Sequence, residues 1–379
     1  MVATTKLRRN SAIELLRIVA MLIIIADHFS VHGLFHFIDR AVPEIVLNNI
    51  YSYQILFTKF VDWGGTLGNC IFILITGYFM INRQVKYKKI IILLATMFFY
   101  SWVILIFVYI FMPQLCSVKL MFNSLIPIFV GENWFVSCYI IFFAFVPFIN
   151  KFLGMIDKKI YEKFLIVAFG FYIFLPFLRM QTFMKEAPIL FFVLVYAIGG
   201  YLRLYFMEKI NLTYHKQYIR NTVFILTMIL SSILMLEIIA IFVHKNILVT
   251  KATYISHLFD IPLAIMIFLS FATMKPFFNK YVNIVAGTVL GVYLLHENMF
   301  LRRIIWDYIF PNVDYITSNW YILFYAIKVV AIFVICSGID LLRKRYIEPP
   351  MARFIDRYFD AVNEYVKIKA NNVIALLNK

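Results

Sequence analysis

The sequence contains little charge and few cysteines. Only 15% of its 379 residues are charged, and 20 Asp and Glu are set against 36 Lys and Arg. The cysteines show no paired spacing, so we expect no structural disulfide and no metal site. The four are Cys70, Cys116, Cys138 and Cys336.

Nucleotide-binding loops are also lacking. No segment reads GxxxxGK[ST], and no GxGxxG opens a predicted helix. The run GGTLG at 64–68 is too short for a phosphate loop and fits a turn or close helix packing better. Because internal repeats and flexible linkers are missing as well, we expect one membrane domain over 1–345 and a separate tail over 346–379.

Hydrophobic residues, in contrast, are abundant. They make up 63% of the chain, and the mean hydropathy is +0.85, whereas a soluble chain is about half apolar. Apolar stretches long enough to cross a bilayer recur, which predicts an all-α integral membrane protein with about ten transmembrane helices. The predicted spans are 13–31, 66–81, 88–112, 134–149, 163–178, 187–206, 221–243, 252–274, 284–301 and 319–342. Segments 45–65 and 119–130 are predicted to be re-entrant or interfacial.

The distribution of basic residues predicts the orientation of these spans. With the N-terminus inside, the cytoplasmic loops and their edges carry 25 of the 36 Lys and Arg, and the external segments carry nine. Such a bias favours cytoplasmic N- and C-termini. The net charge of +16 then reflects topology and contact with anionic lipid. Since the basic residues form no single surface, nucleic acid is not an expected partner.

The tail has the periodicity of an amphipathic helix. Apolar residues recur at helical spacing from 351 to 377, after Pro349 and Pro350, and basic residues interrupt them. The pattern predicts either a helix lying on the cytoplasmic leaflet or a helix packed on the cytoplasmic loops.

The first predicted span carries ionisable residues that are costly in a membrane. A charged side chain at the bilayer centre costs roughly 3 kcal/mol and by default indicates a functional site. Arg17 and His28 are eleven residues apart, which places them on one helix face roughly 16 Å apart along the axis. Glu14 and His32 extend this polar stripe by one turn at each end. It must face the bundle interior, unless Glu14 and Arg17 form only a structural pair and His28 lies at the external interface.

Four motifs together resemble the membrane acyltransferase-3 family, whose members O-acylate sugars and polysaccharides. The first is the Arg17-x10-His28 pattern. The others are NCIFILITGYFM at 69–80, GENWFVSCYIIFFAFVPFIN at 131–150 and LGVYLLHEN at 290–298. Their order and spacing cover residues 11–342, and the combination is similar to the subgroup associated with bacterial surface polysaccharides. The resemblance implies a multi-pass protein of the bacterial plasma membrane.

The resemblance also implies an acyl-CoA donor, usually acetyl-CoA, that arrives from the cytoplasm as a substrate and is not a permanently bound cofactor. Its phosphates are expected to bind Arg17 together with Arg83, Lys86, Lys88 and Lys89. The family often has an Arg-rich cluster at this loop. Here lysines replace most of the arginines, and Lys binds phosphate only as a point charge. These lysines are equally explained by the usual basic bias of cytoplasmic loops.

The acceptor is expected to be a sugar or polysaccharide hydroxyl presented outside. A hydroxyl needs a base at neutral pH, and His28 has a suitable intrinsic pKa. It would deprotonate the hydroxyl or first accept the acyl group itself. Glu14, Arg17 and His296 are further catalytic candidates, although His296 could equally serve a structural role.

Three residues are predicted to bind the acceptor. Trp134 and Glu132 begin the fourth span from outside and could stack on and hydrogen-bond a sugar; the alternative for Trp134 is an interfacial anchor. Asp27, about 100° round the helix from His28, is expected to contact another helix. Further intramembrane ionisable residues without an assigned partner are Glu237, His257, Asp260 and Lys328.

A transporter or flippase of a polysaccharide precursor is the competing function. It would also show many spans with buried charge, but transporters commonly contain duplicated halves, and none is evident here. In a membrane sensor or scaffold, the polar stripe of the first span would have no function. No sequence feature indicates an oligomeric state.

Overall fold

The structure is a computed structural model that describes residues 10–35, 41–129, 133–177, 188–242, 250–359 and residue 369. Every regular element in these ranges is helical. The long helices are α1 (Ser11–Gly33), α4 (Gly64–Met80), α5 (Tyr87–Phe111), α7 (Trp134–Met155), α8 (Lys158–Phe177), α10 (Pro188–Tyr205), α11 (His215–Phe242), α12 (Thr250–Ala272) and α16 (Tyr321–Tyr346).

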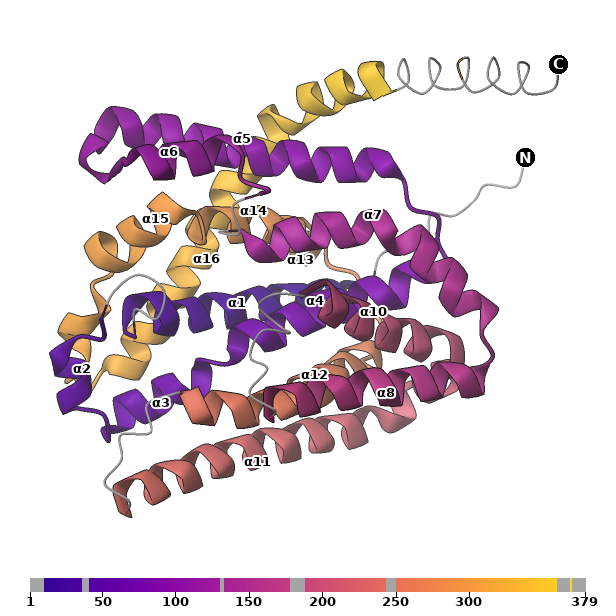
Figure 1. The fold of residues 1–379 in the computed structure, drawn as a ribbon, viewed down its shortest axis with the longest axis horizontal. Coiled ribbons are helices and arrows are strands. Elements are labelled where there is room, and N and C mark those ends of the chain that lie inside the picture. The colour runs from indigo at the N-terminus through magenta and orange to yellow at the C-terminus, as the bar shows by residue number, and fades with distance from the viewer. Residues whose placement is uncertain are drawn as a thin grey trace.

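Helix α1 lies at the centre of the bundle. It packs against α4, α12 and α16, and also against two short helices, α13 (Lys280–Ala286) and α14 (Val289–His296). Figure 1 shows α1 running between α4 and the α13–α14 pair, with α11 on the outside and α16 crossing obliquely. Most of the α1 side chains are buried. The prediction that its polar stripe faces the bundle interior is therefore confirmed for Glu14 and His32, which are buried, whereas the Arg17 side chain is 36% exposed.

The chain is a multi-pass membrane protein. Each of the ten predicted spans overlaps a helix, and within the described residues six helical segments are long and apolar enough to cross a membrane, or seven when one bent pair is counted. Helices α1, α8 and α12 are not among the six, so the count of ten stays a prediction, as does the orientation. The six are Tyr53–Met80, Tyr87–Phe111, Trp134–Met155, Pro188–Tyr205, Leu212–Ile239 and Tyr321–Tyr346.

Two spans differ in shape from their predictions. The second is longer than 66–81, because α3 (Tyr53–Val61) and α4 together form a span of 28 residues. The ninth, predicted as continuous over 284–301, is broken. Lys280–His296 and Met299–Tyr315 meet at an angle of 74°. The break falls where the Asn298 side chain accepts hydrogen bonds from the backbone N–H groups of Phe300 and Leu301 and so caps a new helix.

The described part of the tail is helical over 348–359 and contacts the start of α5. Lys88 forms an ion pair with Asp356, Ile355 is buried, and Phe354 and Tyr358 are exposed. This arrangement combines a packed contact with an exposed aromatic face. The choice between the two predicted roles of the tail stays open, and nearly all of the chain after residue 359 lies outside the described residues.

Close packing of α4 on α10 depends on two glycines. A Cβ atom at Gly77 would overlap the backbone oxygen of Tyr196, and one at Gly199 would overlap the backbone oxygen of Leu74. Backbone atoms cannot rotate away as a side chain can, so the helices would have to separate. Small residues commonly allow this approach in membrane helices.

Gly77→Ala is therefore expected to destabilise the protein by about 1–3 kcal/mol, the usual cost of overpacking. The measurement is the thermal melting temperature of the purified protein in detergent. Gly154→Ala is the matched control, because a Cβ atom at Gly154 meets nothing within 4 Å. Equal melting of the two variants would contradict the account.

Candidate active site

Four side chains meet where α1 passes the break in the ninth span. His28 Nδ1 lies 2.9 Å from His296 Nε2 and 3.0 Å from a carboxylate oxygen of Glu297. His32, one turn after His28, places its Nε2 atom 3.2 Å from the same Glu297 oxygen. The ring centroids of His28 and His296 are 5.1 Å apart. Two imidazoles thus contact one carboxylate, and the third, that of His296, contacts His28.

Hydrogen-bond partners fix the tautomers in this cluster. His296 Nδ1 lies 2.6 Å from the carbonyl oxygen of Val292. A carbonyl can only accept, so this nitrogen carries the proton and the Nε2 atom of neutral His296 must accept. His28 Nδ1 therefore donates to His296 Nε2, and a carboxylate oxygen of Glu297 lies 3.0 Å from the same nitrogen. The Nε2 atom of neutral His28 is left with a free lone pair, the form that a base or nucleophile requires.

The cluster is shielded from solvent and electrostatically balanced. His296 is fully buried, Glu297 is 5% exposed and His32 is 5% exposed. Arg302 Nη1 lies 3.4 Å from the second oxygen of Glu297, so a guanidinium faces this carboxylate. A buried charge is costly unless it is paired and hydrogen-bonded, and Glu297 has both kinds of partner. His28 is the least enclosed of the three histidines, with 14% of its side chain exposed.

Local structure explains how these groups come together. His28 and His32 are four residues apart on α1 and so lie on one face; their ring centroids are 5.3 Å apart. Helix α14 ends at His296, and the chain turns sharply before α15 (Met299–Arg303). Non-helical backbone at membrane depth is tolerated only when protein or a cavity surrounds it. Because the chain turns here, the consecutive residues His296 and Glu297 both face α1.

The same geometry bears on metal binding. One ligand atom each of His28, His32 and Glu297 lies within 4.8 Å of the others, and two imidazoles with a carboxylate form a donor set suited to a metal ion. The absence of a metal site stays a prediction; ion-pair contacts of 3.0 and 3.2 Å join Glu297 to His28 and His32.

Aromatic side chains cover one side of the cluster. The Tyr293 ring lies 6.3 Å from His28, and the Phe135 ring lies 5.8 Å from Tyr293. The predicted sugar-stacking residue, Trp134, begins α7 and is 40% exposed; among the described residues its ring packs against Phe135. Phe135 is thus closer to the chemistry than its neighbour. Glu132, the other predicted sugar ligand on this segment, lies outside the described residues.

Asp27 contacts a neighbouring helix, as expected from its position on α1. It accepts a hydrogen bond from the backbone of Gly65, at the start of α4. A Cβ atom at Gly65 would lie 2.5 Å from the Asp27 carboxylate, so only glycine allows this contact. Asp27 lies 3.9 Å from His28 Nε2, beyond hydrogen-bond distance but next to the free lone pair. Its predicted role in acceptor binding stays a prediction.

At the other end of the stripe, Arg17 and Glu14 form a loose pair. Arg17 Nε lies 4.0 Å from Glu14, at the limit of an ion pair, and 36% of the Arg17 side chain is exposed. The guanidinium is close enough to Tyr139 of α7 to influence its hydroxyl electrostatically. Arg17 therefore faces protein on one side and is accessible on the other, as a ligand for an anion would be.

The predicted donor-binding loop is on the surface. Arg83, Lys86 and Lys89 are exposed around the start of α5. Lys88 differs because it forms an ion pair with Asp356. The first three side chains are free to contact a polyanion, and Lys88 would have to exchange its carboxylate partner.

The sequence analysis missed some residues of the site and left other intramembrane residues without partners. Glu297 and Arg302 were not assigned to the site, and His32 was noted only as an extension of the stripe. Glu237 pairs with Lys59 at 2.6 Å in a buried contact between α11 and α3. Lys328 donates to Asn312 at 3.0 Å. Asp260 is fully buried on α12, and the side chain of His257 lies outside the described set.

Fold and site together define a multi-pass membrane protein with a buried imidazole–carboxylate cluster at a broken helix. Comparison with known families gives this description a chemical meaning. A family model described as an acyltransferase domain matches residues 10–340. The chain belongs to the acyltransferase-3 family, which supports acyl transfer as its general chemistry. No curated protein and no solved structure matches the chain in the corresponding searches.

Proposed function

We propose that the protein transfers an acyl group, in the first instance acetyl, from acyl-CoA to a hydroxyl of a sugar or polysaccharide on the outer side of a bacterial plasma membrane. One observation carries the proposal. The Nδ1 atom of His28 donates to His296 and lies 3.0 Å from the Glu297 carboxylate, and its Nε2 atom is free on the least buried histidine of the cluster. This arrangement follows the logic by which a carboxylate orients a catalytic imidazole.

The chemistry follows from the tautomers. His28 Nε2 takes the proton of the acceptor hydroxyl while the oxygen attacks the thioester carbonyl. The carbon–sulfur bond breaks, and the CoA thiolate leaves and recovers the proton from His28. In the intervening state His28 is an imidazolium, and the Glu297 carboxylate 3.0 Å away stabilises it. In the variant route the His28 Nε2 atom attacks the thioester first and the CoA thiolate leaves. The acceptor hydroxyl then attacks the acyl-imidazole, the carbon–nitrogen bond breaks to return neutral His28, and the hydroxyl proton passes to the thiolate.

The remaining cluster members have supporting roles in this proposal. His296 limits His28 to one tautomer, because its own Nδ1 proton is committed to Val292. Arg302 balances the charge of Glu297. Both act through another side chain and are positioning residues.

Exposed basic residues support the donor half of the proposal. CoA carries several phosphates, and Arg83, Lys86 and Lys89 are exposed at one end of the second and third spans. Arg17 lies on the same helix as His28 and is partly accessible. An acyl group that is delivered from this end must reach His28 along α1, roughly 16 Å away.

Replacing Lys86 and Lys89 together with Gln is expected to raise KM for acyl-CoA several-fold and to leave kcat nearly unchanged. The lost attraction is electrostatic, so the difference should shrink at high salt. The measurement is initial rate against acyl-CoA concentration at two ionic strengths. Lys216→Gln/Arg220→Gln is the matched control, since both residues are exposed in another predicted cytoplasmic segment. Equal KM values for the two double variants would remove the loop from donor binding.

The proposal as a whole is tested by the O-acyl content of the surface polysaccharide in cells with and without the protein. The expected result is a loss of O-acyl groups without the protein, and restoration when it is supplied again. A purified preparation assayed after exposure to a chelator is expected to keep its activity. Loss of activity on chelation would assign His28, His32 and Glu297 to a metal ion and would contradict the base role of His28.

A transporter or flippase remains the second candidate, favoured by the 74° bend of the ninth span. Broken helices at membrane depth often form transport sites. A transporter would move the sugar intact, whereas the proposed enzyme changes it covalently. Mass analysis of the sugar therefore separates the two functions.

A further inference from the structure

The short helix that carries His296 is supported on another side by α16. Helix α14 has only eight residues and packs against both α1 and α16. Gly291 and His296 are five residues apart, which places them about 140° apart around the helix. His296 contacts His28 of α1, and Gly291 contacts Asp340 of α16. The position of α14 against α16 therefore determines how His296 meets α1.

The contact between Gly291 and Asp340 leaves no room for a side chain on α14. A Cβ atom at Gly291 would overlap the Cβ, Cγ and Oδ1 atoms of Asp340, so the α14 backbone lies directly on this side chain. A polar contact joins the same two segments nearby, because the hydroxyl of Thr288 lies 3.0 Å from that of Ser337. Small residues at such interfaces allow helices to approach closely in membranes. The Asp340 side chain thus limits how close α14 comes to α16.

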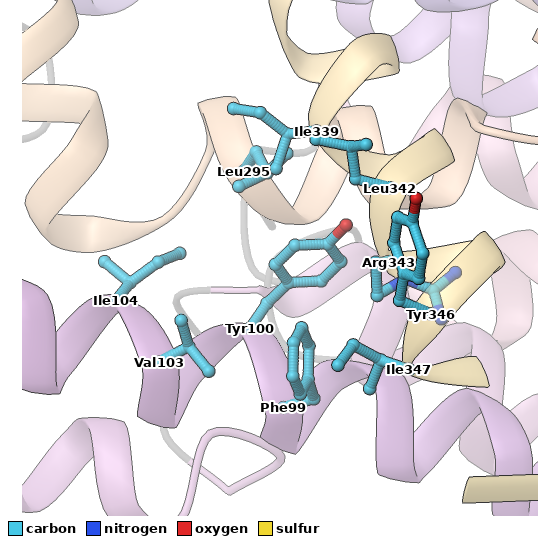
Figure 2. Close-up of a pocket in the computed structure, with 10 residues that line it drawn as sticks. All are labelled: Phe99, Tyr100, Val103, Ile104, Leu295, Ile339, Leu342, Arg343, Tyr346 and Ile347. Atoms are coloured by element: carbon cyan, nitrogen blue, oxygen red, sulfur yellow. The ribbon is translucent and has the colours of Figure 1, made fainter. Parts of the chain in front are cut away.

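Asp340 can act as a fixed spacer because its carboxyl group is held by two donors. The residue is fully buried. Its Oδ1 atom accepts hydrogen bonds from the Tyr100 hydroxyl and from Arg343 Nε, both at 2.7 Å. Figure 2 shows Tyr100 of α5 and Arg343 of α16 in one pocket with Leu295 of α14. A buried charge requires hydrogen-bonded partners, and here these partners restrict where the side chain can lie.

We propose that Asp340 is a positioning residue for acyl transfer. Its side chain sets the spacing between α14 and α16 and thereby places His296 and Glu297 against His28. His28 and His296 are already 2.9 Å apart, so α14 cannot shift without disturbing this contact. A misplacement of about 1 Å at a catalytic group can lower the rate roughly 10²-fold. The effect on rate rests on the proposed function of His28, whereas the spacing itself does not.

Gly291→Ala is expected to lower kcat about 10²-fold and to leave KM for acyl-CoA nearly unchanged. The added methyl group pushes α14 away from α16, while the basic residues expected to bind the donor lie on other elements. Gly338→Ala is the matched control on α16, because a Cβ atom there meets nothing within 4 Å. A wild-type kcat in Gly291→Ala, or an equal fall in both variants, would overturn the proposal.

Two changes at Asp340 separate spacing from charge. Asp340→Asn keeps the shape and the Oδ1 acceptor, and Arg343 retains its contact with Glu348 at 3.0 Å, so kcat should stay close to the wild type. Gly291→Ala/Asp340→Gly removes the three atoms that the methyl group would overlap. This double variant should regain about tenfold of the lost kcat, a coupling typical of residues in contact. No recovery, or a loss in Asp340→Asn as large as in Gly291→Ala, would contradict the role of Asp340 as a spacer.

A cross-linking measurement tests the position of α14 without an acyl-transfer assay. His28→Cys/His296→Cys introduces two thiols at the contact, and dibromobimane links thiols that lie close together. The cross-linked fraction, measured by peptide mass spectrometry, is expected to fall when Gly291→Ala is added and to stay unchanged with Gly338→Ala. Equal cross-linking in the two would rule out the positioning role even if the protein acylates sugar. Retained activity in His28→Ala would instead contradict only the proposed function.

Discussion

His28→Ala is expected to lower the rate of acyl transfer by about 10²–10⁴, the range for loss of a positioned acid–base group. By the tautomer assignment, the Nε2 atom of His28 carries no proton. It also belongs to the most exposed histidine of the cluster. The measurement is transfer of labelled acetyl from acetyl-CoA to a sugar acceptor by the purified variant.

The control for this variant must separate chemistry from folding. His28→Ala should elute as the wild type does on size exclusion and keep most of its melting temperature, because Glu297 retains its contacts with His32 and Arg302. His215→Ala is a matched substitution at the start of α11, where the imidazole lies 3.2 Å from the Thr273 hydroxyl. Retained activity in His28→Ala would remove this residue from the mechanism.

Glu297→Gln is expected to have the second largest effect on activity, at least about 10² on kcat. The amide keeps the shape of the side chain but removes the charge that stabilises a His28 imidazolium. It also removes the anion that faces Arg302, and breaking a buried ion pair typically costs about 3–5 kcal/mol of stability. Both the rate and the melting temperature should therefore fall.

A double variant distinguishes these two effects of Glu297→Gln. Combining it with Arg302→Gln removes both charges of the pair and should restore much of the melting temperature, because neither charge is left facing a neutral partner. Activity should stay low, since the carboxylate is still missing. Recovery of activity together with stability would show that Glu297 is only structural.

The polar stripe of the first span was predictable from the sequence because it depends only on helical periodicity. The eleven-residue spacing of Arg17 and His28, and the cost of burying such groups in lipid, were enough to direct the stripe inward. The motif resemblance then gave the family, which the match over residues 10–340 confirms.

The partners of His28 were not predictable in the same way. His296 lies 268 residues further along the chain, and periodicity identifies a helix face but not the helix that packs against it. The break after His296 did leave a signal. Asn298 is a favoured N-cap residue within a predicted span, and reading it as a helix start would have predicted a turn at Glu297.

Other expectations failed or stayed open for physical reasons. The ninth span was predicted as continuous because its hydropathy is uniform, although one side-chain cap is enough to break a helix that protein surrounds. Trp134 was singled out by residue type, but its neighbour Phe135 points towards Tyr293 and the cluster. A single-residue difference in position on a helix changes the face by about 100°.

The most direct test of the account uses proteoliposomes with labelled acetyl-CoA on one side of the membrane and a sugar acceptor on the other. The account predicts O-acetylated sugar on the acceptor side with the wild type, and none with His28→Ala in the same membrane. Equal acetylation by His28→Ala, or passage of unmodified sugar through the wild-type protein without acetylation, would contradict it.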